Sequence, residues 1–337
     1  MSKKAYAAAG VDVDLGNKVK RGIQKLVGDT HGPEVLGKVG GFGGLFRPDF
    51  RGMKEPVLVS SVDGVGTKLK IAFAVNKHDT IGQDLVNHCI NDIAVVGARP
   101  LFFLDYLASA TLEPKVFTQI LKGFAKACKA GGCALIGGET AQMPGMYQPG
   151  EYDVAGTIVG VVDRAKMLDG SAVRKGDVLI GLASNGLHTN GYSLAREILF
   201  GKMKLTPKSR LARVKGTLGD ELLRVHKNYQ PLMAGLPSRV LKAAAHITGG
   251  GLIDNLPRVL PADLDASIDT AAWTVPAIFQ AMGKAGKVDR EEMFQVFNMG
   301  IGMVLIVTEK SAPLVLRQTK GRVIGRIVPG SGIVKLS

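Results

Sequence analysis

The sequence has few cysteines and contains no hydrophobic run of membrane-spanning length. Its three cysteines, Cys89, Cys128 and Cys133, are an odd number among 337 residues. Their spacing fits neither a disulfide framework nor a zinc site. The longest uninterrupted stretch of apolar residues and glycine, residues 299–307, is too short to cross a bilayer. We therefore expect reduced thiols in a protein that does not enter a membrane.

A targeting segment is also missing from the start of the sequence. The basic residues at positions 1–4 are followed by small residues. Asp12 and Asp14 then interrupt the segment before an apolar region of signal-peptide length develops. This pattern predicts a cytoplasmic protein.

Acidic residues are scarce relative to basic ones. Lys and Arg number 43 against 29 Asp and Glu, which gives a formal net charge of +14. Positive charge is densest in residues 201–242, and such a region could attract nucleic acid or an anionic ligand. Tyr229 is the only aromatic residue there, so a platform for stacking bases is lacking. We expect a solvated basic surface and no nucleic-acid partner.

The sequence does have a large apolar fraction, 46%, and alternating helix and strand signals. The length suggests about two domains at roughly 150 residues each. The polar, glycine-containing stretch at 163–176 predicts a boundary that gives domains 1–165 and 166–337. The alternation predicts an α/β or α+β fold. We expect helices at 18–27, 82–97, 113–130, 193–200 and 231–245, and strands at 57–62, 101–107, 134–136, 154–162, 178–182, 266–268, 303–307 and 323–328.

The first candidate site is the glycine-rich turn at 63–68, which reads Asp-Gly-Val-Gly-Thr-Lys. Glycines let a backbone approach a phosphate closely, and the exposed N–H groups can bind it. Asp63 could hold Mg²⁺, and Lys68 could face a phosphate as a point charge. The turn is not a Walker A loop, because GxxxxGK[ST] is absent. A tight turn with a solvated Asp and Lys explains the local pattern equally well.

A polar face on the helix expected at 82–97 is the second candidate. This face carries Asp84, Asn87, His88 and Asn91, with Asp92 at its edge. Asn and Asp are poor helix formers in a helix interior, so their presence needs a reason. Asp84 and Asp92 are about 12 Å apart along a helix, so they could not both touch one ion without other ligands between them, and Asp92 is the better metal candidate. A plain solvent-facing stripe is the alternative interpretation.

Two polar loops follow other expected strands. Glu139 comes after the double glycine 137–138, where a carboxylate at a strand end would meet a bound ligand. The segment 184–193 contains His188 and Asn190 and precedes a helix. His188 could transfer protons near neutral pH. A purely structural loop and a hydrogen-bonded structural histidine are the alternatives.

Glycine clusters supply the remaining signals. Gly249, Gly250 and Gly251 precede an apparent helix start and could form a phosphate cradle. Residues 40–44 are a weaker example and could form a mobile lid. Ordinary glycine-rich turns explain either segment as well. Because HExxH, CxxC and GxSxG motifs are absent, the residues alone predict ATP or phosphorylated-ligand chemistry and nothing narrower.

Six segments nevertheless occur in the order of one known family: DGVGTK at 63–68, NDIAVVGARPLFFLDYLA at 91–108, GGETAQMPGMY at 137–147, YDVAGTIVGVV at 152–162, GLHTNGYSL at 186–194 and HITGGGLIDNLPRVLP at 246–261. On these segments the chain resembles the phosphoribosylformylglycinamidine cyclo-ligases, also called aminoimidazole ribonucleotide (AIR) synthetases. The similarity extends over about residues 10–329. The third and sixth segments are specific, whereas the first is shared more loosely across the superfamily.

The resemblance implies ATP-dependent closure of the imidazole ring of formylglycinamidine ribonucleotide, with Mg²⁺ and the suggestion of K⁺. It implies a homodimer in which the N-terminal domains complete a β-barrel, and a C-terminal α/β domain with a helix-covered mixed sheet. It suggests catalytic roles for His188, Lys68 and Asp92. The other roles it suggests are ATP or phosphate binding by Asp63, Gly64, Gly66, Thr67, Lys68, Gly138 and Glu139, substrate binding by His188, Asn190, Gly249, Gly250 and Gly251, and metal binding by Asp63, Asp92 and Glu139.

The chain departs from the family pattern at its start and in the basic region 201–242, which is more positive than the family pattern leads us to expect. The family often reads Tyr-Lys/Arg-Asp-Ala-Gly-Val-Asp near its start, whereas residues 6–12 here lack the charged pair. Among the alternatives, the amidotransferase-linked formylglycinamidine ribonucleotide synthetase resembles two such units in a much longer chain. A selenophosphate synthetase would carry a reactive Cys in the glycine-rich loop, and residues 40–44 have none. A thiamine monophosphate kinase does not typically carry the 137–147 motif. A non-catalytic nucleotide- or RNA-binding module is favoured only by the altered start and the basic second half.

Overall fold

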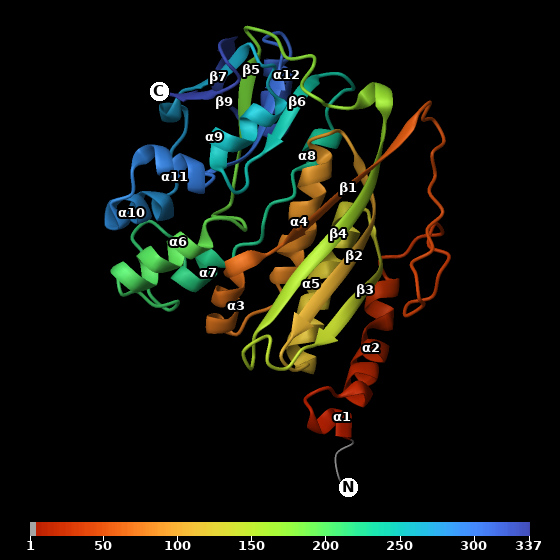
Figure 1. The fold of residues 1–337 in the computed structure, drawn as a ribbon. Helices are drawn as coiled ribbons and strands as arrows, with labels where there is room; N and C mark the ends of the chain where they lie inside the picture. The colour runs from red at the N-terminus through yellow and green to blue at the C-terminus, as the bar shows by residue number, and fades with distance from the viewer. Residues whose placement is uncertain (1–4) are drawn as a thin grey trace.

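The computed structural model describes residues 5–337, so the basic start at residues 1–4 lies outside the described residues. The chain forms two α/β units, each built on its own sheet (Figure 1). The strands of the first sheet lie between residues 56 and 163, and those of the second between residues 178 and 336. The predicted mixed α/β class is confirmed.

The first sheet has four strands in the order β1-β4-β2-β3. Strand β4 pairs antiparallel with both β1 and β2, and β3 is parallel to β2. A parallel pair needs a crossover connection, and helix α5 supplies it. The strands are β1 Pro56–Gly64, β2 Arg99–Ser109, β3 Ala134–Gln142 and β4 Tyr152–Asp163, and the helices are α1 Ala5–Ala8, α2 Val13–Gly28, α3 Leu69–Val75, α4 Ile81–Ala94 and α5 Pro114–Gly131.

Helices α4 and α5 pack together on one face of this sheet (Figure 1). Their close approach depends on Gly82 and Gly123. A Cβ at Gly82 would lie 2.3 Å from the carbonyl oxygen of Ile120, and one at Gly123 would lie 2.9 Å from that of Asp79. The opposite face of the sheet is largely uncovered, and on β1 the side chains of Leu58 and Val62 are 61% and 69% exposed.

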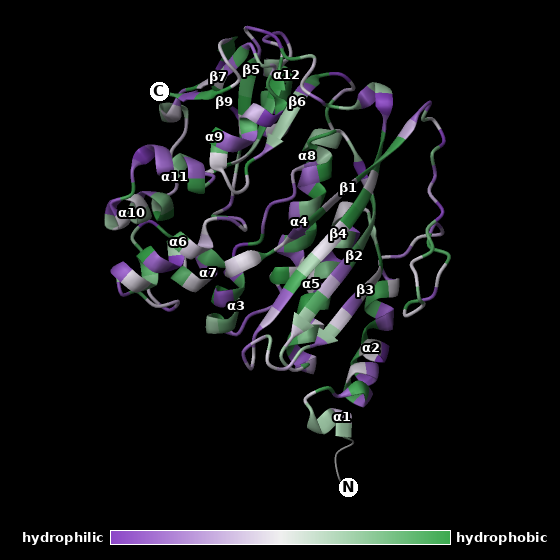
Figure 2. Ribbon diagram, viewed as in Figure 1, coloured by the Kyte–Doolittle hydropathy of each residue, from purple (hydrophilic) through white to green (hydrophobic). Residues whose placement is uncertain are grey.

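The second sheet has six strands in the order β10-β7-β9-β5-β8-β6. Strands β5 and β8 are buried along most of their length, which fits their continuous hydrophobic sequence (Figure 2). The strands are β5 Val178–Ala183, β6 Leu241–His246, β7 Leu264–Ile268, β8 Ile301–Val307, β9 Arg322–Pro329 and β10 Val334–Leu336. The helices are α6 Tyr192–Arg196, α7 Leu218–Leu222, α8 Gln230–Ala234, α9 Gly251–Asn255, α10 Ala277–Gly286, α11 Arg290–Val296 and α12 Ala312–Thr319.

The helix predicted for residues 231–245 is wrong in its second half. Helix α8 ends at Ala234, and residues 241–246 form strand β6 at the edge of the second sheet. Three consecutive alanines, 243–245, favour a helix by propensity, but pairing with β8 and full burial select a strand instead. Pro237 separates the two elements.

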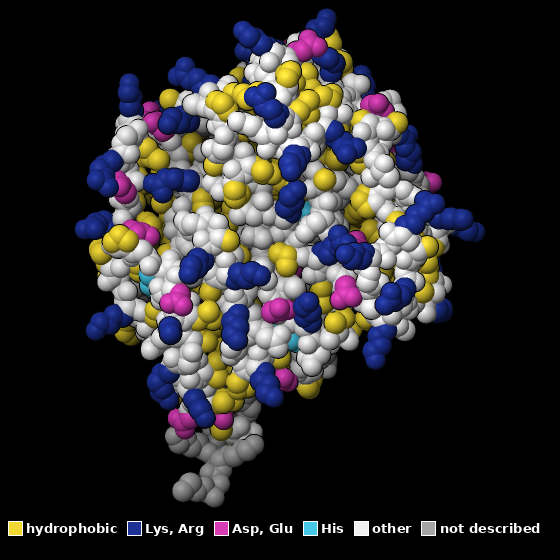
Figure 3. Space-filling view, turned by 180° about the vertical axis from the view of Figure 1, so that it is seen from behind, with side chains coloured by type: hydrophobic (Ala, Val, Ile, Leu, Met, Phe, Trp, Pro, Cys, Tyr) yellow, Lys and Arg dark blue, Asp and Glu magenta, His cyan; other side chains and the backbone are white. Residues whose placement is uncertain are grey.

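In the described part of the chain, no helix combines the length and apolarity needed to span a membrane. Cys89, Cys128 and Cys133 are all buried free thiols. Lys and Arg side chains are spread over the face seen in Figure 3 with Asp and Glu between them, as a solvated surface would show.

Candidate active site

The end of β1 and the middle of α4 bring two carboxylates to one imidazole at the junction of the two units. Nε2 of His88 lies 2.7 Å from Oδ2 of Asp63 and 3.6 Å from Oδ2 of Asp92. The imidazole is buried, whereas the side chains of Asp63 and Asp92 keep 40% and 27% of their surface exposed. The structure therefore places the predicted metal ligands Asp63 and Asp92 side by side and leaves both carboxylates accessible to a ligand.

The second unit reaches these carboxylates through a chain of hydrogen bonds that the sequence did not reveal. Asp92 also lies 2.8 Å from Nδ1 of His246, the last residue of β6. Nε2 of His246 lies 2.9 Å from Nε2 of His226, and Nδ1 of His226 lies 3.2 Å from Oγ1 of Thr189. The same hydroxyl lies 2.8 Å from Nδ1 of His88, which closes the chain.

Donors and acceptors in this chain can be assigned by following the protons from Asp92. An ionised Asp92 accepts from Nδ1 of His246, so Nε2 of a neutral His246 accepts from Nε2 of His226. Nδ1 of His226 then accepts from the Thr189 hydroxyl. Burial favours these neutral rings, since it lowers the pKa of His246 and lowers that of His226 well below the ordinary value.

The proton count ends on His88. Its Nδ1 donates to Thr189, whose own proton goes to His226, and its Nε2 donates to Asp63. Both ring nitrogens therefore carry protons, and His88 is an imidazolium. Burial opposes that charge, but the hydrogen bond to Asp63 and the nearby carboxylates outweigh it and raise the pKa of His88.

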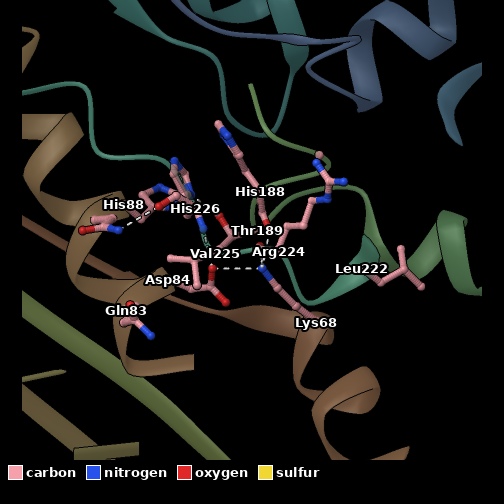
Figure 4. A network of polar contacts seen from close by, with 12 residues as sticks. Lys68, Gln83, Asp84, His88, His188, Thr189, Leu222, Arg224, Val225 and His226 are labelled. Atoms are coloured by element: carbon pink, nitrogen blue, oxygen red, sulfur yellow. Dashed lines mark hydrogen bonds and ion pairs between the residues drawn. The ribbon is translucent and has the colours of Figure 1, made fainter. Parts of the chain in front are cut away.

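Lys68 does not occupy the place that the sequence suggested. Its amine is fully buried and donates to Oδ1 of Asp84 at 2.9 Å, to the carbonyl of His188 at 2.9 Å and to the carbonyl of Arg224 at 2.7 Å (Figure 4). All three of its protons are used, so none remains for a phosphate. Lys68, which the sequence predicted to face a phosphate, instead connects the two units through buried hydrogen bonds.

The exposed residues of the glycine-rich turn are Gly66 and Thr67, whereas Val65 is buried. Gly66 has a positive φ of 65°, which glycine adopts without strain, and both Gly66 and Thr67 are exposed. The Thr67 hydroxyl lies 3.0 Å from that of Ser193 in the second unit. Gly64 ends β1 beside Asp63, and its N–H donates to the carboxylate of Asp63 at 2.6 Å. The exposed backbone of Gly66 and Thr67 therefore lies close in sequence to the accessible carboxylate of Asp63, whereas the N–H of Gly64 is already bonded.

His188 lies inside the structure and not on the substrate-facing surface. It is 1% exposed, and its ring stacks on His226 with centroids 4.1 Å apart. Burial lowers the pKa of His188 well below its ordinary value. The geometry gives it a packing role and does not support direct proton transfer to a substrate. Asn190, two residues on, is half-buried and lies against the 249–251 loop, since a Cβ at Gly249 would be 3.3 Å from its side-chain oxygen.

Gly250 and Gly251 belong to the same loop, and glycine is required at these positions by the local backbone conformation and packing. Both have positive φ, 96° and 58°. A Cβ at Gly251 would lie 1.9 Å from the carbonyl oxygen of Phe294, so only glycine fits. Asn255 fastens the loop by donating to the carbonyls of Gly249 and Gly251. Helix α9 has only five residues, so the loop is held by these contacts more than by a helix end.

Glu139 is far from the carboxylate pair within one chain. It lies on β3, and β3 and β1 are the opposite edges of the first sheet. Three strand spacings separate these edges, about 14 Å. Glu139 and Asp63 of one chain therefore cannot bind the same ion, and the predicted three-residue metal set reduces to Asp63 and Asp92.

Gly138 and Glu139 instead line a cavity of about 530 Å³ beneath residues 40–44. The cavity lies at the β3 edge between α2, α5 and the glycine-rich loop. Asp105, which pairs with Gly138 in the register, is also in its wall. Burial and the neighbouring Glu139 raise the pKa of Asp105 to about 7. Asp105 was not among the predicted site residues, and its place in the hydrophobic strand 101–107 was the only available signal.

The polar face of α4 is divided between the site and the domain junction. His88 and Asp92 face the carboxylate pair, whereas Asp84, Asn87 and Asn91 hydrogen-bond the extended backbone of residues 226–229. The face is therefore no solvent stripe. His226, His246 and Thr189 were not among the predicted site residues, although His246 lies only three positions before Gly249 of the glycine cluster.

Comparison with known proteins identifies the family. Residues 50–162 match the model of the AIR synthase related protein, N-terminal domain, and residues 174–336 match that of its C-terminal domain. A curated phosphoribosylformylglycinamidine cyclo-ligase from Geobacillus sp. (strain WCH70) is 49% identical over 98% of this chain and 97% of that protein. The chain belongs to the phosphoribosylformylglycinamidine cyclo-ligase family.

Other curated cyclo-ligases are similar to this chain to the same degree. The cyclo-ligase of Geotalea uraniireducens is 52% identical over 95% of this chain and 92% of its own length, and that of Pseudothermotoga lettingae is 50% identical over 96% and 97%. Among solved structures, a thiamine-monophosphate kinase from Stenotrophomonas maltophilia K279a aligns over 94% of this chain and 95% of its own with a TM-score of 0.68 and 19% identity. The hydrogenase maturation protein HypE in complex with ATP covers 94% of this chain and 90% of its own, with a TM-score of 0.66 and 18% identity. These structural neighbours share the fold of the cyclo-ligase family.

Proposed function

We propose that this protein is a phosphoribosylformylglycinamidine cyclo-ligase, which uses ATP to close the imidazole ring of formylglycinamidine ribonucleotide and releases ADP and phosphate. The observation that carries the proposal is identity of about half of all residues to curated cyclo-ligases over nearly the full chain. Identity under 20% to the kinase and HypE structures supports only a common fold.

The reaction needs a leaving group at the amide carbon of the substrate. ATP transfers its γ-phosphoryl group to the amide oxygen, and a nitrogen of the same substrate then attacks that carbon and expels phosphate. Because the nucleophile is already part of the substrate, the protein contributes mainly orientation and charge. Asp63 and Asp92 are the residues that would hold Mg²⁺, and their exposed oxygens suit it. Bound there, Mg²⁺ would neutralise charge on the transferring phosphoryl group.

The triphosphate of the nucleotide is assigned to the exposed carboxylates of Asp63 and Asp92. Asp63, Gly156, Asp105 and Gly138 lie in one register row across the four strands of the first sheet. Gly156 is buried and a Cβ there would lie 2.1 Å from the Phe103 ring, so the cavity under residues 40–44 is separate from the carboxylate pair of the same chain. Thr67 and Gly66 would offer backbone N–H groups to the triphosphate next to Gly64, and residues 40–44 would cover the cavity lined by Gly138 and Glu139.

The substrate is assigned to the facing edge of the second unit. Asn190 and the loop of Gly249, Gly250 and Gly251 lie together there. His246, three residues before Gly249, hydrogen-bonds Asp92 and so fixes this edge relative to the carboxylates. Lys68 and His188 are buried behind the junction, and their role in the reaction is to hold it in place.

A homodimer completes the proposal. The uncovered face of the first sheet carries Leu58, Val62 and Tyr106, with Val62 69% exposed. Burying such residues against a second copy would form the β-barrel that the family resemblance implies. We also propose a cytoplasmic location and no nucleic-acid partner. K⁺ dependence is carried only by the resemblance.

The experiment is coupled product formation from formylglycinamidine ribonucleotide, Mg-ATP and K⁺. ADP and the diazotisable aminoimidazole should form in equal amounts and only with substrate present. ADP without the imidazole would contradict the proposal and indicate a kinase. The Asp63→Asn variant should lose activity by about 100-fold or more with its thermal unfolding preserved, whereas Asp263→Asn, an exposed aspartate of the second unit, should remain active.

A further inference from the structure

A pocket of about 290 Å³ lies where the C-terminal end of α4 meets α8, at the junction of the two units (Figure 1). Three segments of the chain line it: residues 94–99 at the end of α4, the connection between the units at 166–168, and residues 230–241 of the second unit. None of the residues assigned above to ATP, metal or substrate is in its wall. Ligand pockets have volumes of roughly 300–1,000 Å³, so this pocket suits a small ligand.

Backbone contacts hold the three segments in place. The N–H of Leu168 donates to the carbonyl of Val96 at 3.2 Å, and a Cβ at Gly97 would lie 2.9 Å from the carbonyl oxygen of Lys166. The turn at 237–240 is closed by a backbone hydrogen bond of 3.2 Å between its first and last residues. The walls therefore consist of fixed backbone from both units, and the pocket exists before any ligand binds.

The lining of the pocket carries positive charge and, among the described residues that form it, no Asp or Glu. Each segment contributes one exposed cation, Arg99, Lys166 or Arg239. Within residues 5–337, none of the three forms an ion pair with a carboxylate. Arg99 donates to the backbone carbonyl of Asp49 at 2.8 Å, and the carboxylate of Asp49 is already paired with Arg51. Cations without a carboxylate partner around one hollow attract an anion, and Arg and Lys are common partners of phosphate.

Another part of the wall is apolar. Met233 and Leu236 are buried, and Leu168 is half-buried. Gln230 and Ser238 are the neutral polar residues of the lining. Such a mixture of apolar surface with a few polar and charged groups is typical of sites for small organic ligands. An inorganic anion would leave the apolar part of the wall uncovered, whereas a ring attached to a phosphate would cover it.

We propose that this pocket binds a small organic phosphate in which a ring carries one phosphate group, as in a nucleoside monophosphate. The cations would hold the phosphate, and Met233 and Leu236 would contact the ring. Since Arg99 belongs to the first unit and Arg239 to the second, the bound ligand would connect the two units. The site goes beyond ring closure and does not depend on it.

The test uses full-length wild-type protein with ¹³C-labelled methionine methyl groups and AMP as the probe. Mg²⁺ and a non-hydrolysable ATP analogue are present at saturation, so that AMP does not report on the ATP site. The methyl signal of Met233, assigned from Met233→Leu, should shift saturably with a Kd of about 1 mM or lower. A nuclear Overhauser effect between ¹³C-labelled AMP and this methyl group should show direct contact. Inorganic phosphate should bind at least about tenfold more weakly, because it makes no contact with the apolar wall.

Substitutions locate the cations. Arg239→Gln and Lys166→Gln should each weaken AMP binding by about tenfold or more. Arg213→Gln is the matched control and should bind AMP as wild type does. Arg213 is also an exposed arginine of the second unit with a positive φ, 64° against 65° for Arg239, but it is outside the pocket.

Three results would overturn the proposal. The first is the absence of a shift or of an Overhauser effect at the Met233 methyl group in wild-type protein, which needs no substitution at a cation. The second is unchanged AMP binding in Arg239→Gln. The third is equal affinity for AMP and inorganic phosphate, because the apolar wall would then contribute nothing.

Discussion

Two residues of the same turn, five positions apart, have opposite environments. Asp63 has an accessible carboxylate beside His88, whereas Lys68 is fully buried with every proton bonded. The sequence predicted a phosphate-facing role for both. The partners of Lys68 in the second unit are 120 and 156 residues away in sequence. No local pattern could therefore have revealed that Lys68 connects the two units.

The Lys68→Met substitution tests that role. It leaves the buried carboxylate of Asp84 without its counter-charge, so the free energy of unfolding should fall by about 3–5 kcal/mol. Adding Asp84→Asn should restore part of the loss, because the amide oxygen can still accept from the N–H of His226. Urea titrations measure both variants. A Lys68→Met protein of wild-type stability with a raised KM for ATP would return the residue to the phosphate site.

Asp105 gives a prediction about pH. Its pKa of about 7 in the fold exceeds the value of about 3.9 expected when unfolded, so the unfolded chain ionises first. The free energy of unfolding of the wild-type protein should therefore fall as pH rises from about 4 to 7. Asp105→Asn does not titrate and should be more stable than wild type at pH 8, by up to about 4 kcal/mol, with little difference at pH 4.

Urea titrations at pH 4, 6 and 8 measure this difference, with Asp263→Asn as the control. That residue is exposed in the second unit, and its substitution should produce no such trend. A constant difference between Asp105→Asn and wild type across this range would contradict the raised pKa.

At the scale of elements, helix α4 connects the candidate active site to the second unit. Its polar face bonds the backbone of residues 226–229 and also presents His88 and Asp92. Most helices and strands follow from hydrophobic periodicity, and the polar face was recognised as needing a reason. What the face contacts depends on the tertiary fold. Strand β6 was not predicted for the same reason. Its alanines favour a helix by propensity, and only pairing within the sheet makes them a strand.

Asn91 on that face of α4 hydrogen-bonds two backbone groups of the 226–229 segment. Its amide donates to the carbonyl of Lys227 at 2.8 Å and accepts from the N–H of Tyr229 at 2.8 Å. Asn91→Ala leaves both backbone groups unpaired and should cost about 2–4 kcal/mol of unfolding free energy. Hydrogen exchange at the Tyr229 amide should accelerate.

Asn87→Ala is the matched control for this substitution. Asn87 makes only one such bond, to the carbonyl of His226, so its loss should cost less. Equal stability of the two variants and of wild type would show that the 226–229 segment is held by other contacts.

At the scale of the whole molecule, the exposed face of the first sheet is the feature that one chain leaves unfinished. Val62→Glu places a charge where the second copy would pack, so the protein should become monomeric while its thermal unfolding changes little, because Val62 is 69% exposed. Light scattering measures the mass. Val323→Glu, at a 40% exposed position on β9 of the second unit, should leave the dimer intact. A monomeric wild-type protein would remove the proposed barrel.

The central claim is that this chain activates an amide oxygen with ATP and then closes a ring. The most direct measurement uses formylglycinamidine ribonucleotide labelled with ¹⁸O in that amide oxygen and follows the products by ³¹P NMR. The account predicts one ¹⁸O atom in each inorganic phosphate released, in step with aminoimidazole formation. Unlabelled phosphate accompanying the aminoimidazole would contradict the account, because ring closure would then proceed without phosphorylation of that oxygen.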